Sequence, residues 1–342
     1  MVELHQGSPE EWDRAVATLP GGNFCHLHAW TSVFADTFGH ETRQWVVRDA
    51  GGRIHALLPL VRMRSLLFGH SLLSMPFLNY GGPIGDPESC RALIDAALDH
   101  GRRTRADRVE LRARARPPTD APIHNEKVTV LLPLPDDAET LWTDGLKAKV
   151  RSQVRRPMKE GMTTEFGAHL VDDFYRVFAR NMRDLGTPVL PRSLFTNIAR
   201  AFPEQMILAV VRTKEGAAVA AGCGFLYRGE FELTWASALR EFNREAPNML
   251  LYWALMEEVI RRGGRVFNFG RCTPGGGTHR FKLQWGGEDQ PLHWVRWAPR
   301  GEAAAPSKER GIYARAVTVW QRLPVPVANV LGPLVSRGLP SW

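Results

Sequence analysis

The stretch FNFGRCTPGGGTHRFKLQW, residues 267–285, is the most informative part of this chain. It continues a short apolar strand predicted over residues 265–269, crosses a loop of small residues at 273–278, and ends in a cationic and aromatic run at 279–285. Three consecutive glycines carry no Cβ, so the backbone can bend sharply there and come close to a ligand. The stretch therefore predicts either a tight turn or a binding loop.

Basic side chains flank the glycines. Arg271 precedes them, and Arg280 and Lys282 follow them. Positive groups on both sides of a bend favour a pocket for phosphate or carboxylate, although a solvated hairpin explains the same pattern. The stretch is not a Walker loop, because no Gly-Lys-Ser/Thr follows the glycines. It is not a dinucleotide fingerprint either, because we expect no helix to open after them.

Composition sets the class of protein. The chain has 342 residues, of which 44% are hydrophobic and 23% charged, as expected for a globular protein of two ordinary domains. A net charge of +8 favours anionic partners, namely nucleic acid, a phosphorylated carrier or an anionic membrane face, although solubility alone also explains it. The four cysteines lack metal-binding spacing, so we expect reduced thiols and no metal. Without a signal pattern or a long apolar run, we expect a cytoplasmic protein.

Apolar periodicity and turn residues predict alternating helices and strands. The expected helices cover residues 8–19, 28–38, 89–102, 138–160, 171–185, 191–202 and 247–262. The expected strands cover residues 43–48, 54–63, 66–76, 108–114, 128–134, 163–166, 206–212, 217–227, 230–237 and 265–270, with 281–297 completing a sheet.

An internal repeat organises these elements. A strand–turn–strand unit at 45–63 recurs at 209–225, and a helix–Gly–strand unit at 93–111 recurs at 255–269. Two copies of one α+β unit are the economical interpretation. We expect a first domain at 1–136, a second at 137–300 and a tail at 301–342.

Two further segments carry unusual charge. Within the helix expected at 138–160, Arg151 and Arg155 share one face, where like charges repel unless an anion offsets them or water solvates them. The tail at 311–342 mixes apolar residues with arginines, and its prolines prevent a spanning helix. We expect either an interfacial membrane anchor or a helix packed on the body of the protein.

Several of these motifs resemble the Fem family of aminoacyl-transferases, which share the GNAT acyltransferase fold. The basic run 146–156 and the helix, strand and FKLQWG pattern across 248–286 are similar to that family. The blocks 181–189 and 270–274 most closely resemble Fem-like proteins associated with exosortase (PEP-CTERM) systems in exopolysaccharide loci. The resemblance implies an α+β fold of two tandem GNAT-like domains, with mixed sheets flanked by helices.

The resemblance also implies transfer of an acyl or aminoacyl group to an amine or hydroxyl. Fem enzymes take the group from aminoacyl-tRNA and pass it to a peptidoglycan precursor. This chain lacks the coiled-coil arm of some members, so aminoacyl-tRNA and acyl-CoA both remain candidate donors, each as a co-substrate and not as a bound cofactor. The expected acceptor is an anionic or lipid-linked precursor of the cell envelope or of an exopolysaccharide, met in the cytoplasm or at the inner membrane face. The alternatives are an acyl-CoA N-acyltransferase and a non-catalytic module that binds an anionic glycan or lipid carrier.

One pair of candidate catalytic residues comes from the resemblance, and the others come from the mechanism expected for acyl transfer. Phe281 and Lys282 match the Phe–Lys pair that Fem enzymes use near the reacting ester, so Lys282 is expected to neutralise a phosphate or the oxyanion. Asp184 or His279 is expected to relay a proton, and Arg271 to bind the acceptor. Because no Ser/His/Asp order is present, we expect direct attack by the acceptor.

The other expected contacts are to substrate. In a GNAT-like core, backbone N–H groups between Trp235 and Asn248 would hold donor phosphates. The remaining expected substrate-binding residues are Asn181, Arg183, Gly275, Gly276, Gly277, Trp285, Lys147, Lys149, Arg151 and Arg155.

Overall fold

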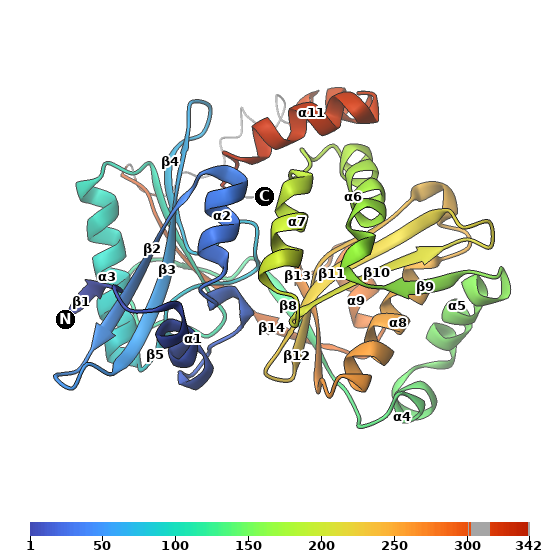
Figure 1. Ribbon diagram of the computed structural model, residues 1–342, viewed down its shortest axis with the longest axis horizontal. Coiled ribbons are helices and arrows are strands. Elements are labelled where there is room, and N and C mark those ends of the chain that lie inside the picture. The colour runs from blue at the N-terminus through green and yellow to red at the C-terminus, as the bar shows by residue number, and fades with distance from the viewer. Residues whose placement is uncertain (300, 302–314, 341–342) are drawn as a thin grey trace. The chain divides into compact units, whose positions relative to one another are not determined.

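The computed structural model describes residues 1–299, 301 and 315–340 (Figure 1). The chain forms two compact units. The first comprises Met1–Lys127, Pro291–Tyr313 and Leu334–Trp342, and the second comprises Val128–Gln290 and Ala314–Pro333. The chain therefore returns to the first unit after it has built most of the second.

The first unit holds a mixed sheet. Its strands are β1 (Val2–Leu4), β2 (Glu41–Arg48), β3 (Ile54–Ser65), β4 (Gly69–Leu73), β5 (Ile84–Gly85), β6 (Arg108–Ala113), β7 (Ile123–His124) and β15 (His293–Trp297). Their order is β1-β2-β3-β4-β6-β15-β7, with β5 paired to β3. Its helices are α1 (Pro9–Thr18), α2 (Trp30–Phe38) and α3 (Pro87–Arg103), with a 3-10 turn η1 (Phe24–His26).

Local chemistry explains where α3 begins and what it buries. The Asp86 side chain accepts from the Ser89 N–H at the N-cap, and Pro87 occupies the first turn, where no N–H is needed. Leu93, Ile94 and other apolar residues of one face are buried against the sheet.

The second unit holds another mixed sheet. Its strands are β8 (Val128–Pro133), β9 (Thr163–Phe166), β10 (Met206–Arg212), β11 (Ala218–Tyr227), β12 (Glu230–Ala238), β13 (Val266–Cys272) and β14 (Glu288–Pro291), in the order β14-β8-β13-β12-β11-β10-β9. Its α-helices are α4 (Ala138–Thr140), α5 (Ala148–Lys159), α6 (Val171–Leu185), α7 (Arg192–Ala201), α8 (Pro247–Arg261) and α9 (Gly277–Leu283). Short turns are η2 (Leu141–Gly145), η3 (Ala168–Leu170) and η4 (Arg240–Phe242), and α11 (Val325–Ser336) follows near the C-terminus.

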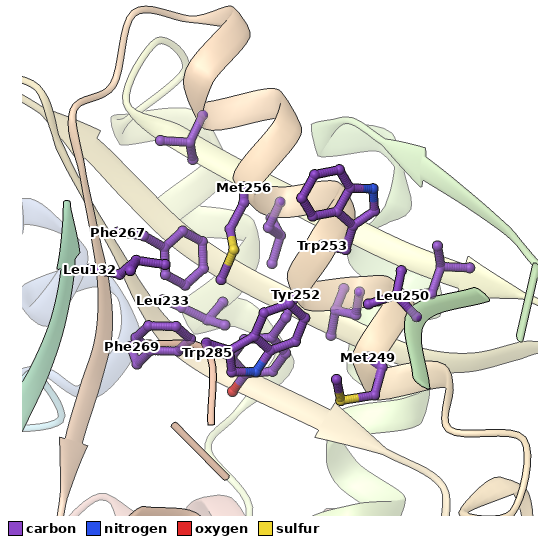
Figure 2. Close-up of a cluster of buried hydrophobic side chains, with 14 of the residues drawn as sticks. Leu132, Leu233, Met249, Leu250, Tyr252, Trp253, Met256, Phe267, Phe269 and Trp285 are labelled. Atoms are coloured by element: carbon purple, nitrogen blue, oxygen red, sulfur yellow. The ribbon is translucent and has the colours of Figure 1, made fainter. Parts of the chain in front are cut away.

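The core of the second unit is centred on α8. This helix is apolar on almost every side, which is the pattern of a buried helix. Figure 2 shows Tyr252 and Met256 of α8 among Phe267 and Phe269 of β13 and Trp285. In Figure 1, α8 and α5 cover one face of the sheet, and α6 and α7 cover the other.

The helices and strands confirm most of the predicted elements, with α6 and β10 ending at the predicted residues. The helix predicted over 138–160 is wrong, because it breaks at Leu146, which is extended (φ −95°, ψ 135°) and buried. Arg151 then donates to the carbonyls of Trp142 and Thr143, at 3.1 and 2.9 Å. Burial of Leu146 drives the break, and Arg151 satisfies carbonyls that the break leaves without helical partners.

The absence of a helix after the glycine run is also a wrong prediction, because α9 opens at Gly277 with Gly276 as its N-cap residue. The sheet predicted to run through 281–297 is instead divided, with β14 in the second sheet and β15 in the first. The compact units also differ from the expected domain ranges. β8 pairs with β13 in the second unit, and β15 pairs with β6 in the first.

A substitution of Phe267 tests how much this core contributes to stability. Its side chain is fully buried between Phe231, Phe269 and Tyr252. We expect Phe267→Ala to lower the free energy of unfolding by about 3–5 kcal/mol, since it leaves a large cavity. Urea denaturation followed by circular dichroism measures this. The control Met158→Ala truncates an exposed apolar residue and should change stability by less than about 0.5 kcal/mol; equal effects of the two substitutions would contradict the assignment.

Candidate active site

The gap between β12 and β13 defines the candidate site. These parallel strands pair only at Glu230–Val266, Phe231–Phe267 and Glu232–Asn268. Beyond these pairs, β12 stays with β11 and β13 stays with β8. The carboxyl ends of the two strands therefore separate, and such ends are where α/β sheets place ligands.

Asn268 fixes the point at which the strands separate. Its Oδ1 accepts from Thr129 Oγ1 at 2.5 Å and from the Gly270 N–H at 2.9 Å. Its Nδ2 donates to Glu230 Oε1 at 2.7 Å. The side chain is fully buried, so these bonds form away from competing water and tie β8, β12 and β13 together.

A cavity of about 300 Å³ lies at this gap. It is lined by Asn181 of α6, Ala236, Ser237 and Ala238 of β12, Asn248, Leu251 and Tyr252 of α8, and Gly277, Thr278 and Phe281 of α9. None of these ten described residues carries a charge at neutral pH. Asn181 Nδ2 donates to Ser237 Oγ at 3.0 Å, which holds two of the polar groups in place. The cavity thus offers amide and hydroxyl groups to an uncharged ligand portion.

Tyr252 joins this cavity to the core. Its ring stacks on Phe269 and on Trp285, at centroid distances of 5.8 and 6.0 Å, and meets the edge of Phe281 at 5.0 Å. Burial raises the pKa of Tyr252, so its hydroxyl keeps its proton at neutral pH. Tyr252 is the titratable side chain among the described residues that line the cavity.

Hydrogen bonds hold the glycine loop beside the cavity. The Gly275 N–H donates to His279 Nδ1 at 3.0 Å, and Arg280 Nη1 donates to the Gly275 carbonyl at 2.9 Å. Because Nδ1 is the acceptor, the ring proton lies on Nε2, which faces both Asp289 oxygens at 2.9 Å. His279 therefore fastens the loop to Asp289 in this arrangement.

Lys282 is buried below the same loop. Its Nζ donates to the carbonyls of Gly270 and Arg271, at 2.6 and 3.0 Å. Burial, with a smaller contribution from the neighbouring Arg271, lowers the pKa of Lys282 to about 8, against the opposing effects of Cys272 and Glu232. Lys282 is not among the described residues that line the cavity, and its contacts tie α9 to β13.

In the segment 235–248, which was expected to bind donor phosphates, several backbone N–H groups already form hydrogen bonds inside the protein. Those of Phe242, Asn243 and Glu245 donate to carbonyls within the segment, and Pro247 has none. Glu241 pairs with Arg180 at 3.0 Å. This start of α8 therefore has fewer donors for a diphosphate than an open helix N-terminus.

Other expected site residues have structural contacts. Arg183 donates to the Leu323 carbonyl at 3.0 Å and pairs with Asp184 at 2.8 Å. Trp235 packs against Phe195 of α7, and Trp285 is buried in the core.

The basic residues of α5 divide into two kinds. Arg151 caps the preceding turn, and Arg155 lies over the Trp142 ring at 5.1 Å. Lys147 and Lys149 are exposed at the start of α5. The two lysines therefore remain accessible to an anion, whereas each arginine already has a partner within the protein.

The corresponding gap in the first unit is filled by its own chain. β4 and β6 pair in parallel at three positions, and beyond them the N–H groups of Gly81 and Gly82 donate to the Arg112 carbonyl at 3.2 and 2.9 Å. Arg112 is fully buried and pairs with Glu110 at 2.9 Å. Burial alone would raise the pKa of Glu110, but Arg112 and Arg296 outweigh it and the pKa is lowered.

A second cavity, of about 550 Å³, lies in the first unit beside the end of β6 and the start of α3. Arg114 and Arg116 line it, together with prolines, glycines and Tyr80, and its described lining residues include no carboxylate. Arg114 lies over the Tyr80 ring at 5.6 Å. This cavity suits a ligand with a negative charge.

The candidate site thus combines predicted and unpredicted residues. Asn181, Asn248, Gly277 and Phe281 were predicted and line the cavity. Ser237, Tyr252 and Thr278 were missed. Tyr252 had a detectable signal, because Asn248, Leu251 and Tyr252 share one helical face at i, i+3 and i+4.

The lowered pKa of Lys282 has a measurable consequence for stability. Its ordinary value is 10.5 and its value in the protein is about 8. The unfolded chain therefore binds more protons between these pH values, so the stabilisation is present above pH 10.5 and lost as pH falls through 8. Relative to Lys282→Met, the wild type should gain up to about 3 kcal/mol of unfolding free energy across this window. Urea titrations of both proteins at several pH values measure this, and a pH-independent difference would refute the buried ammonium.

The family comparisons agree with this geometry. Residues 147–283, from the N-cap of α5 to the end of α9, match the family model described as Acetyltransferase (GNAT) domain. No curated protein matches the sequence significantly. The matched span contains ten helices and strands of the second unit, namely α5 to α9 and β9 to β13.

Solved structures show similarity over nearly the whole chain. FemX is 15% identical, with a TM-score of 0.66, and the match covers 86% of this chain and 97% of FemX. The C-terminal domain of a putative lysylphosphatidylglycerol synthetase from Agrobacterium fabrum is 15% identical, with a TM-score of 0.56 and coverage of 91% and 96%. A tandem GNAT protein from the clavulanic acid biosynthesis pathway is 15% identical, with a TM-score of 0.54 and coverage of 90% and 100%. The chain has a fold of two tandem GNAT domains, and the family match to the second supports an acyltransferase activity.

Proposed function

We propose that this chain transfers an acyl or aminoacyl group to an amine or hydroxyl of a cell-envelope or exopolysaccharide precursor. The observation that carries the proposal is the uncharged cavity at the parting of β12 and β13, inside the span that matches the GNAT family model. Its volume of about 300 Å³ suits the acyl portion of a donor, with the remainder of the donor outside.

The proposed chemistry is direct transfer. The acceptor nitrogen or oxygen attacks the donor carbonyl, a new C–N or C–O bond forms, and the ester or thioester bond breaks. The acceptor's proton ends on the departing oxygen or sulfur. Tyr252 is the proposed hydrogen-bond donor to the developing oxyanion, because burial keeps it protonated. Phe281 forms part of the wall, and Lys282 and His279 position the loop that carries Gly277.

The start of α8 favours an aminoacyl ester over acyl-CoA as donor. A CoA diphosphate would need free donors there, but three N–H groups of this segment are used internally and Pro247 lacks one. Glu241 and Glu245 are balanced in the same segment by Arg240 and Arg244, so the N–H groups, and not charge, disfavour the diphosphate there. The exposed Lys147 and Lys149 give an anionic donor such as aminoacyl-tRNA a cationic contact elsewhere on the unit.

The acceptor is proposed to be anionic. Arg114 and Arg116 line the cavity of about 550 Å³ in the first unit, and its described lining residues include no carboxylate to oppose them. A similar structure is named a lysylphosphatidylglycerol synthetase, which names an aminoacylated anionic lipid. The motif resemblance to exosortase-associated proteins favours an exopolysaccharide precursor. A lipid-linked acceptor would be met at the inner face of the membrane.

Ligand-induced stabilisation tests the donor. We expect aminoacyl-tRNA to raise the melting temperature, because a ligand that binds the folded state stabilises it by about 2.7 kcal/mol at one hundred times Kd. Ala238→Leu should reduce the shift caused by aminoacyl-tRNA relative to uncharged tRNA, because the larger side chain fills the cavity wall. Ala217→Leu, at an exposed turn, should leave that shift unchanged.

The same panel includes acetyl-CoA, longer acyl-CoA and nucleotide-linked or lipid-linked sugars. Stabilisation by acyl-CoA alone would overturn the donor assignment in favour of an acyl-CoA N-acyltransferase. Stabilisation by the sugars with no donor bound would favour a non-catalytic glycan- or lipid-binding module.

A further inference from the structure

Helix α11 presents an apolar stripe to the outside. Val327, Val330, Leu331 and Leu334 recur at i, i+3, i+4 and i+7 and therefore share one helical face. Their exposed fractions are 41%, 69%, 41% and 71%. A row of exposed aliphatic side chains on one helix is the pattern of a docking surface.

The opposite side of α11 is held against the second unit. Ala328 is buried, and a Cβ added at Gly332 would lie 2.7 Å from Val189 Cγ1 and 2.8 Å from its backbone nitrogen. Just before the helix, Arg183 bonds the Leu323 carbonyl and Gln321 Nε2 donates to the Asp184 carbonyl at 3.1 Å. The helix is therefore packed on the body of the protein, and its packing keeps the stripe outward.

A second exposed apolar group adjoins the end of this helix. Leu66 and Leu67, at the tip of the β3–β4 hairpin, are exposed by 106% and 78%. A Cβ added at Gly338, two residues after α11, would lie 2.6 Å from Ser65 Cβ and 3.2 Å from Phe68 Cδ2. The hairpin tip and the chain leaving α11 are thus neighbours within the first unit.

The charged residues within the C-terminal segment that contains α11 have one sign. Residues 310–342 contain four arginines and no aspartate or glutamate. Two of them, Arg322 and Arg337, are exposed on either side of α11. An apolar stripe between two arginines complements a surface of anionic headgroups above acyl chains.

The helix is too short to cross a bilayer. Its 12 residues span about 18 Å, whereas a crossing needs about 20 residues. Across the described part of the chain, every helix falls short of the length and apolarity that a membrane span requires. A helix of this kind can only lie in the interfacial plane.

We propose that α11 docks flat on an anionic bilayer, with Val327, Val330, Leu331 and Leu334 in the interface and Arg322 and Arg337 on the phosphates. This inference deepens the proposed function, since it names the surface that would bring the enzyme to a lipid-linked acceptor. The membrane proposal rests on the exposed apolar face of α11 and on its arginines, so a binding experiment can test it without any transfer assay.

Vesicle flotation of the full chain tests the proposal. We expect binding to vesicles of equal parts phosphatidylcholine and phosphatidylglycerol, and much weaker binding to phosphatidylcholine alone. Val330→Asn/Leu334→Asn should weaken binding at least tenfold, and Arg322→Gln about fivefold with a smaller salt dependence. The control Met158→Asn/Leu4→Asn removes two apolar side chains that are 42% and 47% exposed on α5 and β1, and should bind as the wild type does.

Unchanged melting temperatures and far-ultraviolet spectra of the variants exclude misfolding as the cause. The proposal is overturned by equal binding of the stripe variant and the wild type, by equal binding to both kinds of vesicle, or by no binding to either. A dimer that the stripe substitutions dissociate, seen by analytical ultracentrifugation without vesicle binding, would assign the stripe to a second copy of the chain. Vesicle binding without any aminoacyl transfer would leave this inference intact and refute only the proposed function.

Discussion

The hydrogen bonds of Asn268 are the constraint on which the site depends. One buried amide, at the last paired position of the two parallel strands, bonds Thr129 of β8, Glu230 of β12 and the Gly270 N–H of β13. Beyond these bonds each strand follows its other neighbour, so the sheet opens without losing its ladder. Where β12 and β13 separate, their facing backbone N–H and C=O groups lose each other as partners, and buried backbone groups need partners. The flanking strands β8 and β11 supply those bonds, and side chains of α8 and α9 line the resulting space.

Each unit has a gap between two parallel strands, which forms a cavity in the second unit and is filled by backbone in the first. In the second unit the described residues leave this space as an uncharged cavity. In the first unit, the backbone of Gly81 and Gly82 bonds to Arg112 and fills the equivalent position. The cavity of the first unit lies beside this filled gap and carries arginines. The same architecture therefore provides a neutral space in the second unit, suited to an acyl group, and a positively charged space in the first unit, suited to an anion.

Much of the fold could be predicted from the sequence, because its long helices and strands have clear periodicity. α6 and α8 bury one continuous apolar pattern each, and glycines mark their ends. The wrong predictions concern elements that depend on contacts between residues distant in sequence, or helices whose start is not marked by a conventional N-cap residue. The break at Leu146 follows from its burial, which no local pattern reveals. α9 was missed because the contacts of His279 and Arg280 with Gly275 replace a conventional N-cap side chain. The site was predicted in part for the same reason: Lys282 looks like a ligand for phosphate in sequence, but the fold buries its ammonium on two carbonyls.

The order in which the first sheet is assembled has a consequence for synthesis in the cell. β15 lies between β6 and β7, yet it is encoded after the entire second sheet. On the ribosome, β6 emerges on the order of ten seconds or more before its partner, at ordinary elongation rates. During that interval its edge is open to pairing with other chains. The second unit can meanwhile complete its own sheet, so the half of the protein that is translated first is the half that finishes folding last.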